Sequence, residues 1–455
     1  MNPIISLSGA NSLYVYNFNN KLYAFFGDQH SSIEGGCEEK LNIKCDTFDY
    51  RYEKSVLYDT NCWTIGSLLD EWFTYNNYND IKTDFYFEIS FVKGNLRQDT
   101  DLDTIVTNRR HDQIPNNEAS QSMKGFDWID LISVFFKECL IQDKQYCKYG
   151  PNVRFHYSDI RKYNTQLQLS IPKVQVSDLY IPYPYVDRIN YNLRRLNRKF
   201  RIRIPHIIFD LYGLIKLYDI LLNSNIILEL CFSTTDIRQI LDNIKIYDLP
   251  DTINEIFDHI KSNIIKNGVI RNNILLHRTA AEFNRLHLIN PLIANKLLLY
   301  IKEKLEIDLS KAREKLNNIY QQYLLIDLKN QAFPTEQNPL PFLNQVSHQK
   351  AEIIGDIYEL THTLAETVID FSIIAMDVYT LSRMFIQQDS KQIIVVAGYF
   401  HVYNYANFFK YLGANNIIEY PSTENNRCIT SGLGAILNVN DFRNIYQRVN
   451  NPTIS

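Results

Sequence analysis

The segment KQIIVVAGYFHVYNYANFFKYLGA at 391–414 indicates an α/β fold, because it contains an apolar strand followed directly by a helix. Its apolar beginning, 391–398, has the length of a strand and predicts one that is buried on both faces. The part from 403 to 414 predicts a helix that ends at Gly413, and IIEY at 417–420 predicts the next strand. A buried strand needs neighbours, so the rest of the sheet must come from another part of the chain.

The first 165 residues supply those strands. SLYVYNF at 12–18 and KLYAFFG at 21–27 are rich in aromatic and β-branched residues, and Asn19 and Asn20 separate them. Because asparagine tolerates the left-handed backbone of a tight turn, this arrangement predicts a β-hairpin. Two more strands are expected at 83–92 and 152–160, and helices are expected at 59–75, capped by Asp59 or Thr60, and at 125–142.

The middle of the chain has a different pattern and predicts a helical insertion. Apolar residues recur there at helical spacing, which predicts an amphipathic helix, with a coiled coil as the alternative. This stripe consists of Leu298, Ile301, Leu305, Leu309, Ala312, Leu316, Ile319 and Tyr323. We therefore expect an α/β fold with a mostly parallel sheet flanked by helices, formed by the halves 1–165 and 350–455 and interrupted by a large helical insertion at 166–349.

The composition of the 455 residues is that of a globular protein, with 45% hydrophobic and 22% charged residues. The net charge of −4 argues against a chain-wide role in binding nucleic acid. Asparagine, isoleucine, tyrosine and lysine, which A/T-rich codons encode, are frequent in the chain. This bias suggests an A/T-rich genome, such as that of a large DNA virus, and indicates origin rather than function.

The sequence predicts neither a signal peptide nor a transmembrane helix, since it lacks a basic N-terminal region with an apolar core and any apolar run of membrane-spanning length. An intracellular or virion-associated location is therefore expected. The 7 cysteine residues form an odd set, and the gap within the pairs Cys37/Cys45 and Cys139/Cys147 is longer than zinc ligands favour. We expect buried free thiols rather than disulfides.

Polar residues follow or interrupt several of the predicted strands. Asp28 and His30 follow the strand at 21–27, His401 follows the strand at 391–398, Glu88 lies within an apolar strand, and Asp159 lies at the end of another. Ligands of open α/β sheets bind beyond the carboxyl ends of the strands, so these side chains are expected to meet in one crevice. Histidine and carboxylate side chains together are typical of a metal site or of an acid–base pair that activates water.

Each of these residues also has a simpler interpretation. Glu88 could face water on an edge strand, because a buried carboxylate is costly unless it is paired. His30 could bond to nearby backbone, His401 could be a residue at the start of a helix with no special partner, and Asp159 could cap or pair at the surface. Arg383, on a predicted helix, could be solvated. The two glycine residues beside the histidines, in a chain with only 15 glycines, favour the functional interpretation.

The ordered set of these segments resembles the erythromycin-esterase/ChaN-like and TraB/TIKI superfamily. FFGDQHSS and AGYFH resemble its two Gly-x-x-His motifs, which here end at His30 and His401. FYFEIS resembles the strand that carries a glutamate, VRFHYSDIR the strand that ends in an aspartate, and AMDVYTLSRMF the helix that carries a basic residue, here Arg383. The resemblance covers roughly 250 residues and does not extend to the helical insertion.

The chain departs from the family pattern at two places. Asp28 stands where glutamate is common, and its side chain is shorter by one methylene group. The bulky residues Tyr399 and Phe400 flank His401. These departures bear on whether the chemistry of the family is kept.

The resemblance and the strand-end residues imply a hydrolase of ester or peptide bonds. His30 and His401 would hold a divalent metal ion or position a water molecule. Glu88 or Asp28 would be the general base, and Arg383 would stabilise the negative charge of the transition state. The candidate site residues are therefore Asp28, His30, Glu88, Asp159, Arg383 and His401.

Two alternatives belong to other classes of protein. One is a catalytically degenerate relative that acts as a virion component or binds a host protein, for which the departures and the large insertion are the motive. The other is a toxin or effector domain, because related folds occur within bacterial toxins. The sequence does not identify the substrate.

Overall fold

The computed structural model describes residues 5–28, 37, 41–49, 54–58, 61–90, 139, 148–159, 189, 200–223, 228, 232, 274–331, 371–421, 428–431 and 439–450.

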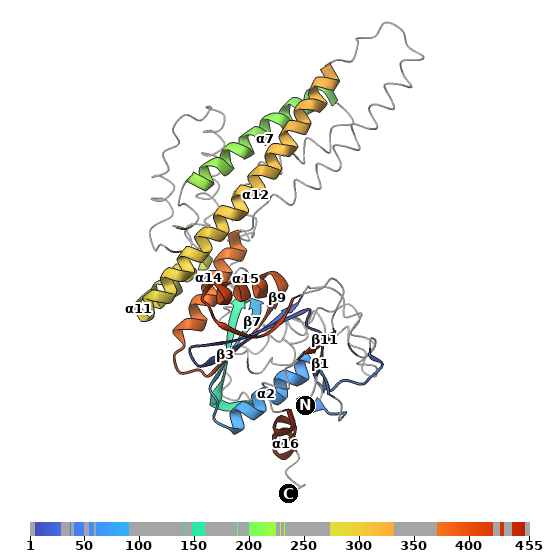
Figure 1. Ribbon diagram of the computed structural model, residues 1–455, viewed down its shortest axis with the longest axis vertical. Helices are drawn as coiled ribbons and strands as arrows, with labels where there is room; N and C mark the ends of the chain where they lie inside the picture. Colours follow the sequence, from blue (N-terminus) through green and yellow to red (C-terminus); the bar gives the residue numbers. More distant parts are fainter. Residues whose placement is uncertain are drawn as a thin grey trace, which may run out of the picture. The chain divides into compact units, whose positions relative to one another are not determined.

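The α/β part is built on a six-stranded sheet, of which β3, β7 and β9 are labelled in Figure 1. The strand order is β10-β2-β3-β9-β7-β8. The strands β3, β9, β7 and β8 are parallel to one another, while β2 and β10 are antiparallel additions at one edge. Since β9 lies between β3 and β7, the two ends of the chain complete one sheet, as predicted. Its strands are β2 (Ser12–Phe18), β3 (Lys21–Asp28), β7 (Thr83–Ser90), β8 (Val153–Asp159), β9 (Gln392–Gly398) and β10 (Asn415–Tyr420).

A second, smaller mixed sheet was not predicted. Its central strand β1 (Ile5–Ser8) pairs antiparallel with β11 (Cys428–Ser431) and parallel with β6 (Cys62–Thr64). A third pair joins β4 (Thr47–Asp49) and β5 (Lys54–Val56). The fold is therefore α/β with two mixed sheets, and the parallel strands of the larger one run from β3 to the edge strand β8.

The turn between β2 and β3 confirms the predicted hairpin. Asn19 and Asn20 have φ angles of 51° and 60°, in the left-handed region that asparagine tolerates. Two consecutive residues of this conformation match the right-handed twist of the strands that they join. Phe18 then pairs with Lys21, which fixes the register of the whole hairpin.

The helix predicted at 59–75 begins later than expected. The segment Cys62–Thr64 is the strand β6, because it pairs with β1, and the helix α2 runs over Ile65–Tyr78. Thr64 is its N-cap, and the Thr64 hydroxyl accepts a hydrogen bond from the backbone N–H of Ser67. The predicted caps at Asp59 and Thr60 are therefore wrong. Cys62–Thr64 form a strand because they pair with β1, although their local sequence predicts a helix.

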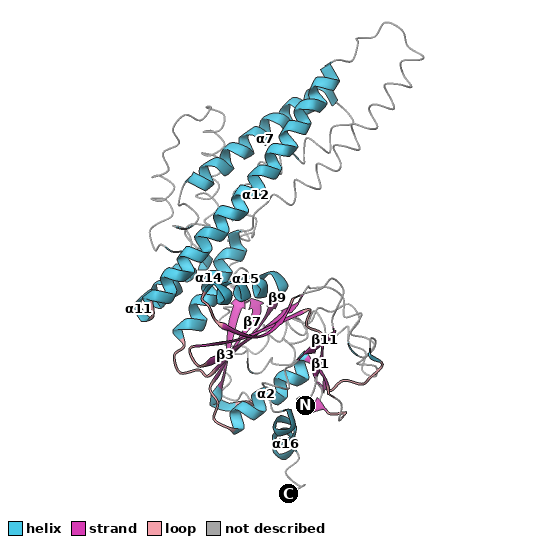
Figure 2. Cartoon of the chain, in the orientation of Figure 1, coloured by secondary structure: helices cyan, strands magenta, loops and turns pink. Residues whose placement is uncertain are grey.

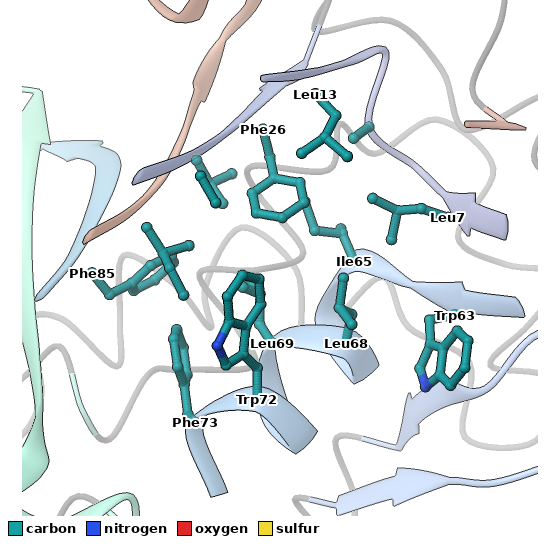
Figure 3. Packing of buried hydrophobic residues seen from close by; sticks show 14 of the residues in the cluster. Leu7, Leu13, Phe26, Trp63, Ile65, Leu68, Leu69, Trp72, Phe73 and Phe85 are labelled. Carbon is teal, nitrogen blue, oxygen red and sulfur yellow. The ribbon is translucent and has the colours of Figure 1, made fainter. Parts of the chain in front are cut away.

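Helices cover both faces of the six-stranded sheet (Figure 2). The helices α2 and α16 (Val439–Asn450) lie on one side, and α14 (Phe371–Ile386) and α15 (Tyr399–Tyr411) lie on the other. The α2 side is apolar, with Phe26 and Phe85 from the sheet packed against Leu69 and Trp72 from the helix (Figure 3).

Aromatic rings fill much of the opposite face. Phe409 of α15 lies with its ring centroid 4.5 Å from that of Tyr23 and 5.1 Å from that of Phe25, both on β3. Phe385 of α14 stacks on the ring of Phe409, with the two ring centroids 5.5 Å apart. These contacts fix α14 and α15 against the sheet, and thus the start of α15 beside the end of β9.

The chain divides into two compact units. One contains Met1–Ser170, Glu282–Lys296 and Met376–Ser455, and the other contains Ile171–Ala281 and Leu297–Ala375. The second unit contains α7 (Phe200–Asn223), the first part of α11 (Ile274–Ile289) and most of α12 (Pro291–Gln331). The predicted stripe is buried from Ile301 to Tyr323, although Leu297 rather than Leu298 is buried at its start. The exact boundaries of the insertion stay a prediction.

The cysteine residues correct the expectation of free thiols. Cys37 is bonded to Cys428 and Cys45 to Cys62, and all four are buried together. Cys139 is also in a disulfide. Spacing along the sequence could not reveal the first of these pairs, because its two members are 391 residues apart and meet only when β11 joins β1.

Among the described helices, none combines the length and the apolar composition that a bilayer crossing requires.

Candidate functional site

The strand β7 carries side chains of opposite character on its two faces. Phe85 and Phe87 belong to the apolar cluster on the α2 side. Asp84, Tyr86 and Glu88 alternate with them and therefore point towards α14 and α15. Two buried carboxylates on one strand are destabilising unless each has a partner. The partners of Asp84 and Glu88 therefore indicate the role of this face.

Glu88 is buried, with an exposed fraction of 7%. Its strand lies between β9 and β8, which rules out a position facing water at a sheet edge. The pairing with β8 shifts between Phe87 and Ser90, an irregularity of the kind that turns side chains near functional sites. The Oε2 atom of Glu88 accepts a hydrogen bond from the backbone N–H of Gly398, the N-cap of α15.

His401 lies in the first turn of α15 and is held from both sides. Its Nδ1 atom is 2.6 Å from Oδ1 of Asp377 on α14, and its Nε2 atom is 3.6 Å from Oε1 of Glu88. The amide of Asn404 donates to the other oxygen of Asp377 at 2.6 Å. His401 thus stands between two carboxylates from two different elements, with an exposed fraction of only 4%.

The two ring nitrogens of His401 have different roles. Asp377 can only accept, so the 2.6 Å contact assigns a proton to Nδ1. The separation of 3.6 Å between Nε2 and Glu88 exceeds a direct hydrogen bond but allows one water molecule to contact both atoms. An imidazole oriented by a carboxylate can act as a general base through its second nitrogen when the ring is neutral.

The other predicted site residues occupy different positions. Asp28 is buried at the end of β3, in register with Gly398 of β9. Alternation along β3 places Asp28 on the face of Phe26, whereas Glu88 and His401 lie on the face of α15. Asp159 is the last residue of β8, where it pairs with Ser90. His30 lies outside the described residues.

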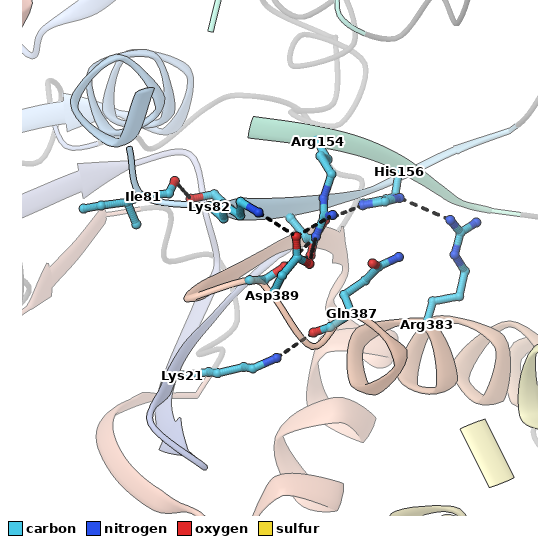
Figure 4. A network of polar contacts seen from close by, with 11 residues as sticks. Lys21, Ile81, Lys82, Arg154, His156, Arg383, Gln387 and Asp389 are labelled. Atoms are coloured by element: carbon cyan, nitrogen blue, oxygen red, sulfur yellow. Dashed lines mark hydrogen bonds and ion pairs between the residues drawn. The ribbon is translucent and has the colours of Figure 1, made fainter. Parts of the chain in front are cut away.

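Arg383 belongs to a second polar network on the same face of the sheet (Figure 4). Its Nη1 atom donates to the hydroxyl of Tyr379 at 2.6 Å, and Nη2 lies 3.2 Å from Nδ1 of His156. His156 in turn contacts Asp84 through Nε2 at 2.7 Å. Arg154 binds the same carboxylate through two hydrogen bonds of 2.7 Å and 2.9 Å. The contacts of Arg383 are therefore with this network and not with the Glu88–His401 pair.

The second network has marked electrostatic consequences. Burial alone would raise the pKa of Asp84, but the hydrogen bonds from His156 and Arg154 outweigh it and hold the pKa at about 2. Burial lowers the pKa of His156 below its ordinary value, although Asp84 opposes this effect. Asp84 is thus a stable anion, and His156 is held neutral between it and Arg383.

Sequence reasoning missed Asp377, which is the partner that orients His401. The residue lies in the quoted segment AMDVYTLSRMF, where only Arg383 was selected. A signal was present, because Asp377 interrupts an apolar helix just as Glu88 interrupts an apolar strand. A buried carboxylate needs a partner at either position.

The metal ion predicted at His30 and His401 stays a prediction, because His30 lies outside the described residues. Among the described side chains, no group of three or more histidine, cysteine or carboxylate residues is arranged to hold a metal ion. Nε2 of His401 and Oε1 of Glu88 are two donors whose separation one ion could span with bonds of roughly 2.0–2.2 Å. A carboxylate behind the ring, as Asp377 provides, is usual for metal-bound histidine. The donor chemistry therefore fits a metal ion, with His30 as the predicted third ligand.

Comparison of the chain with protein-family models, with curated proteins and with solved structures found no match.

Proposed function

We propose that the chain is a hydrolase of ester or peptide bonds in which His401 acts as the general base. The position of His401 between Asp377 at 2.6 Å and Glu88 at 3.6 Å is the observation that supports this most. Three elements of the fold, β7, α14 and α15, hold these side chains in place. Such preorganisation is what acid–base catalysis requires.

The reaction follows from the directions of the donors and acceptors. A water molecule between Nε2 of His401 and Oε1 of Glu88 gives one proton to Nε2 as its oxygen bonds to the carbonyl carbon of the substrate. Asp377 stabilises the imidazolium that forms. The bond between that carbon and the leaving group then breaks, and the proton passes from Nε2 to the leaving oxygen or nitrogen. The net result is the addition of one water molecule across the bond.

A divalent metal ion is a further proposal for the same pair of residues. In this alternative Nε2 of His401 would bind the ion instead of taking up a proton, and Glu88 and His30 would be the other ligands. When bound, such an ion would make a coordinated water molecule more acidic and polarise the carbonyl group.

The test is the hydrolysis of a panel of p-nitrophenyl esters and fluorogenic peptides by the purified chain and by His401→Gln, Asp377→Asn and Glu88→Gln. We expect each change to lower kcat by on the order of 10²–10⁴-fold, because each removes the base, its orienting group or the second contact of the water. Metal analysis, together with turnover before and after treatment with a chelator, tests the metal proposal.

His156→Gln is the matched control, because it also removes a histidine that is bonded to a buried aspartate on the same face of the sheet. It should keep kcat even if it lowers stability. Equal turnover of His401→Gln and the unchanged chain would contradict the role of His401. A lack of turnover across the whole panel would favour the second candidate.

That second candidate is a catalytically degenerate protein that acts in a virion or binds a host protein. The burial of the pair favours it, since His401 and Glu88 are exposed by only 4% and 7%. The disulfides bear on where either protein would work. Because disulfides persist in oxidising surroundings, we propose a virion-associated or lumenal location over a reducing intracellular one.

A further inference from the structure

The N-terminus of α15 is a polar end of the helix within the site. Its N-cap is Gly398, which has no side chain to accept hydrogen bonds from the first turn, and the N–H of Gly398 itself donates to Glu88. The backbone N–H groups of Tyr399, Phe400 and His401 have no acceptor within the helix. They give this end of the helix a partial positive charge that favours a negative ligand.

A buried hydroxyl group faces the same helix end. Ser12 is the first residue of β2, pairs with Gly27 of β3 and has an exposed fraction of 0%. The point that a Cβ atom would occupy on Gly27 is in collision with Oγ of Ser12 and is 3.3 Å from the Cα atom of Tyr399. The absence of a side chain on Gly27 therefore leaves room for both the Ser12 hydroxyl and the first residue of α15.

The Ser12 hydroxyl has no hydrogen-bond partner among the residues that the structure describes. A buried hydroxyl without a partner is destabilising, and a ligand or a water molecule that bonds to it removes this cost. Here the hydroxyl adds a donor to the backbone N–H groups at a helix end. Donors that converge in a buried place bind an oxygen that carries negative charge.

We propose that the Ser12 hydroxyl and the first backbone N–H groups of α15 form an oxyanion hole. This inference rests on the proposed hydrolase. When the water oxygen bonds to the carbonyl carbon, the electron pair of the C=O double bond moves to the carbonyl oxygen, which accepts hydrogen bonds from Ser12 and the helix end. The double bond forms again as the leaving group departs with the proton from Nε2 of His401. Ser12 is thus a catalytic residue that touches the reacting oxygen.

The experiment compares Ser12→Ala with Tyr16→Phe. Tyr16 lies on the same face of β2, has an exposed fraction of 0%, and its hydroxyl also lacks a partner among the described residues. Its ring packs at 5.5 Å on Phe409, in the later part of α15. Both changes remove one buried hydroxyl, but only the first removes it from the start of the helix.

For p-nitrophenyl acetate, we expect Ser12→Ala to lower kcat by on the order of 10²-fold with KM within about twofold, and Tyr16→Phe to leave both unchanged. The melting temperature of Ser12→Ala should not fall, because no internal hydrogen bond is lost. Inorganic phosphate, as an anionic probe, should raise the melting temperature of the unchanged chain more than that of Ser12→Ala.

The phosphate measurement separates this proposal from the proposed function. Stabilisation by phosphate that depends on Ser12, in a chain that hydrolyses nothing, would support the anion site and refute the hydrolase. Equal kcat and an equal response to phosphate in Ser12→Ala and the unchanged chain would overturn the oxyanion hole. Equal losses in Ser12→Ala and Tyr16→Phe would overturn it as well, since they would reflect packing alone.

Discussion

The pKa of His156 depends on burial and on the charged residues around it. Its Nε2 atom contacts Asp84, its Nδ1 atom faces Arg383, and Arg154 binds the same aspartate. A proton on Nδ1 would face the guanidinium group of Arg383. Burial accordingly lowers the pKa of His156 from its ordinary value of 6.5. The native chain therefore binds this proton less readily than the unfolded chain does.

The lowered pKa of His156 makes the stability of the chain depend on pH. As the pH falls below 6.5, His156 becomes protonated in the unfolded chain but stays neutral in the native chain. The free energy of unfolding therefore decreases. We expect His156→Gln to remove this contribution, which is at most about 1.4 kcal/mol per pH unit. Urea unfolding of both chains between pH 5 and 7.5 measures it. Parallel pH profiles for the two chains would contradict the assignment. Asp84 does not interfere, because its titration lies between 3.8 and about 2.

The helix α15 is the element that carries the site, and one aromatic residue anchors it. Phe409 is fully buried, and its ring contacts rings of Tyr23 and Phe25 on the sheet and of Phe385 on α14. His401 lies two turns earlier on the same helix. The packing of Phe409 thus holds the first turn, and with it the imidazole, at a fixed height above Glu88.

We expect Phe409→Ala to lower the free energy of unfolding by about 3–5 kcal/mol, because it leaves a cavity among aromatic rings. The control is Phe400→Ala on the same helix, whose side chain is 72% exposed and whose removal should change stability by less than about 0.5 kcal/mol. Urea unfolding provides both values. Similar losses in the two variants would show that Phe409 is not the anchor.

Covalent bonds link distant parts of the whole molecule. The Cys37–Cys428 disulfide closes a separation of 391 residues and the Cys45–Cys62 disulfide one of 17. Both lie in one buried cluster beside the three-stranded sheet, where Ser6 pairs with Cys62 and Ser8 with Cys428. Each disulfide restricts the unfolded chain, and the longer loop restricts it more.

We expect the double change Cys45→Ser and Cys62→Ser to lower the free energy of unfolding by about 3 kcal/mol, and the double change Cys37→Ser and Cys428→Ser to lower it by more than about 4 kcal/mol. Reduction of the unchanged chain should reproduce the combined loss. Peptide mapping without reductant should recover the fragment that joins Cys37 to Cys428. Alkylation of all 7 cysteine residues in the folded, unreduced chain would contradict these bonds.

Local patterns predicted the elements whose residues decide their own conformation. The asparagine turn at Asn19 and Asn20 is confirmed, since its left-handed backbone depends on those two residues alone. The start of α2 was placed wrongly, because the pairing of Cys62–Thr64 with β1 depends on a strand more than 50 residues away. Of the site, Glu88 and His401 could be selected from sequence, whereas Asp377 and Ser12 could not be ranked without their neighbours.

The formation of an α/β sheet from the two ends of the chain was predictable from sequence, because apolar strands and amphipathic helices are local patterns of side chains. Which polar residues meet depends on how these elements pack in three dimensions. Glu88 contacts His401 because β7 and β9 are neighbours in the sheet, and Arg383 contacts His156 because α14 lies on the face of the sheet to which His156 points. The cost of burying each charge can be read from one residue, but the partner that offsets it comes from another element and is fixed only by the packing of the whole chain.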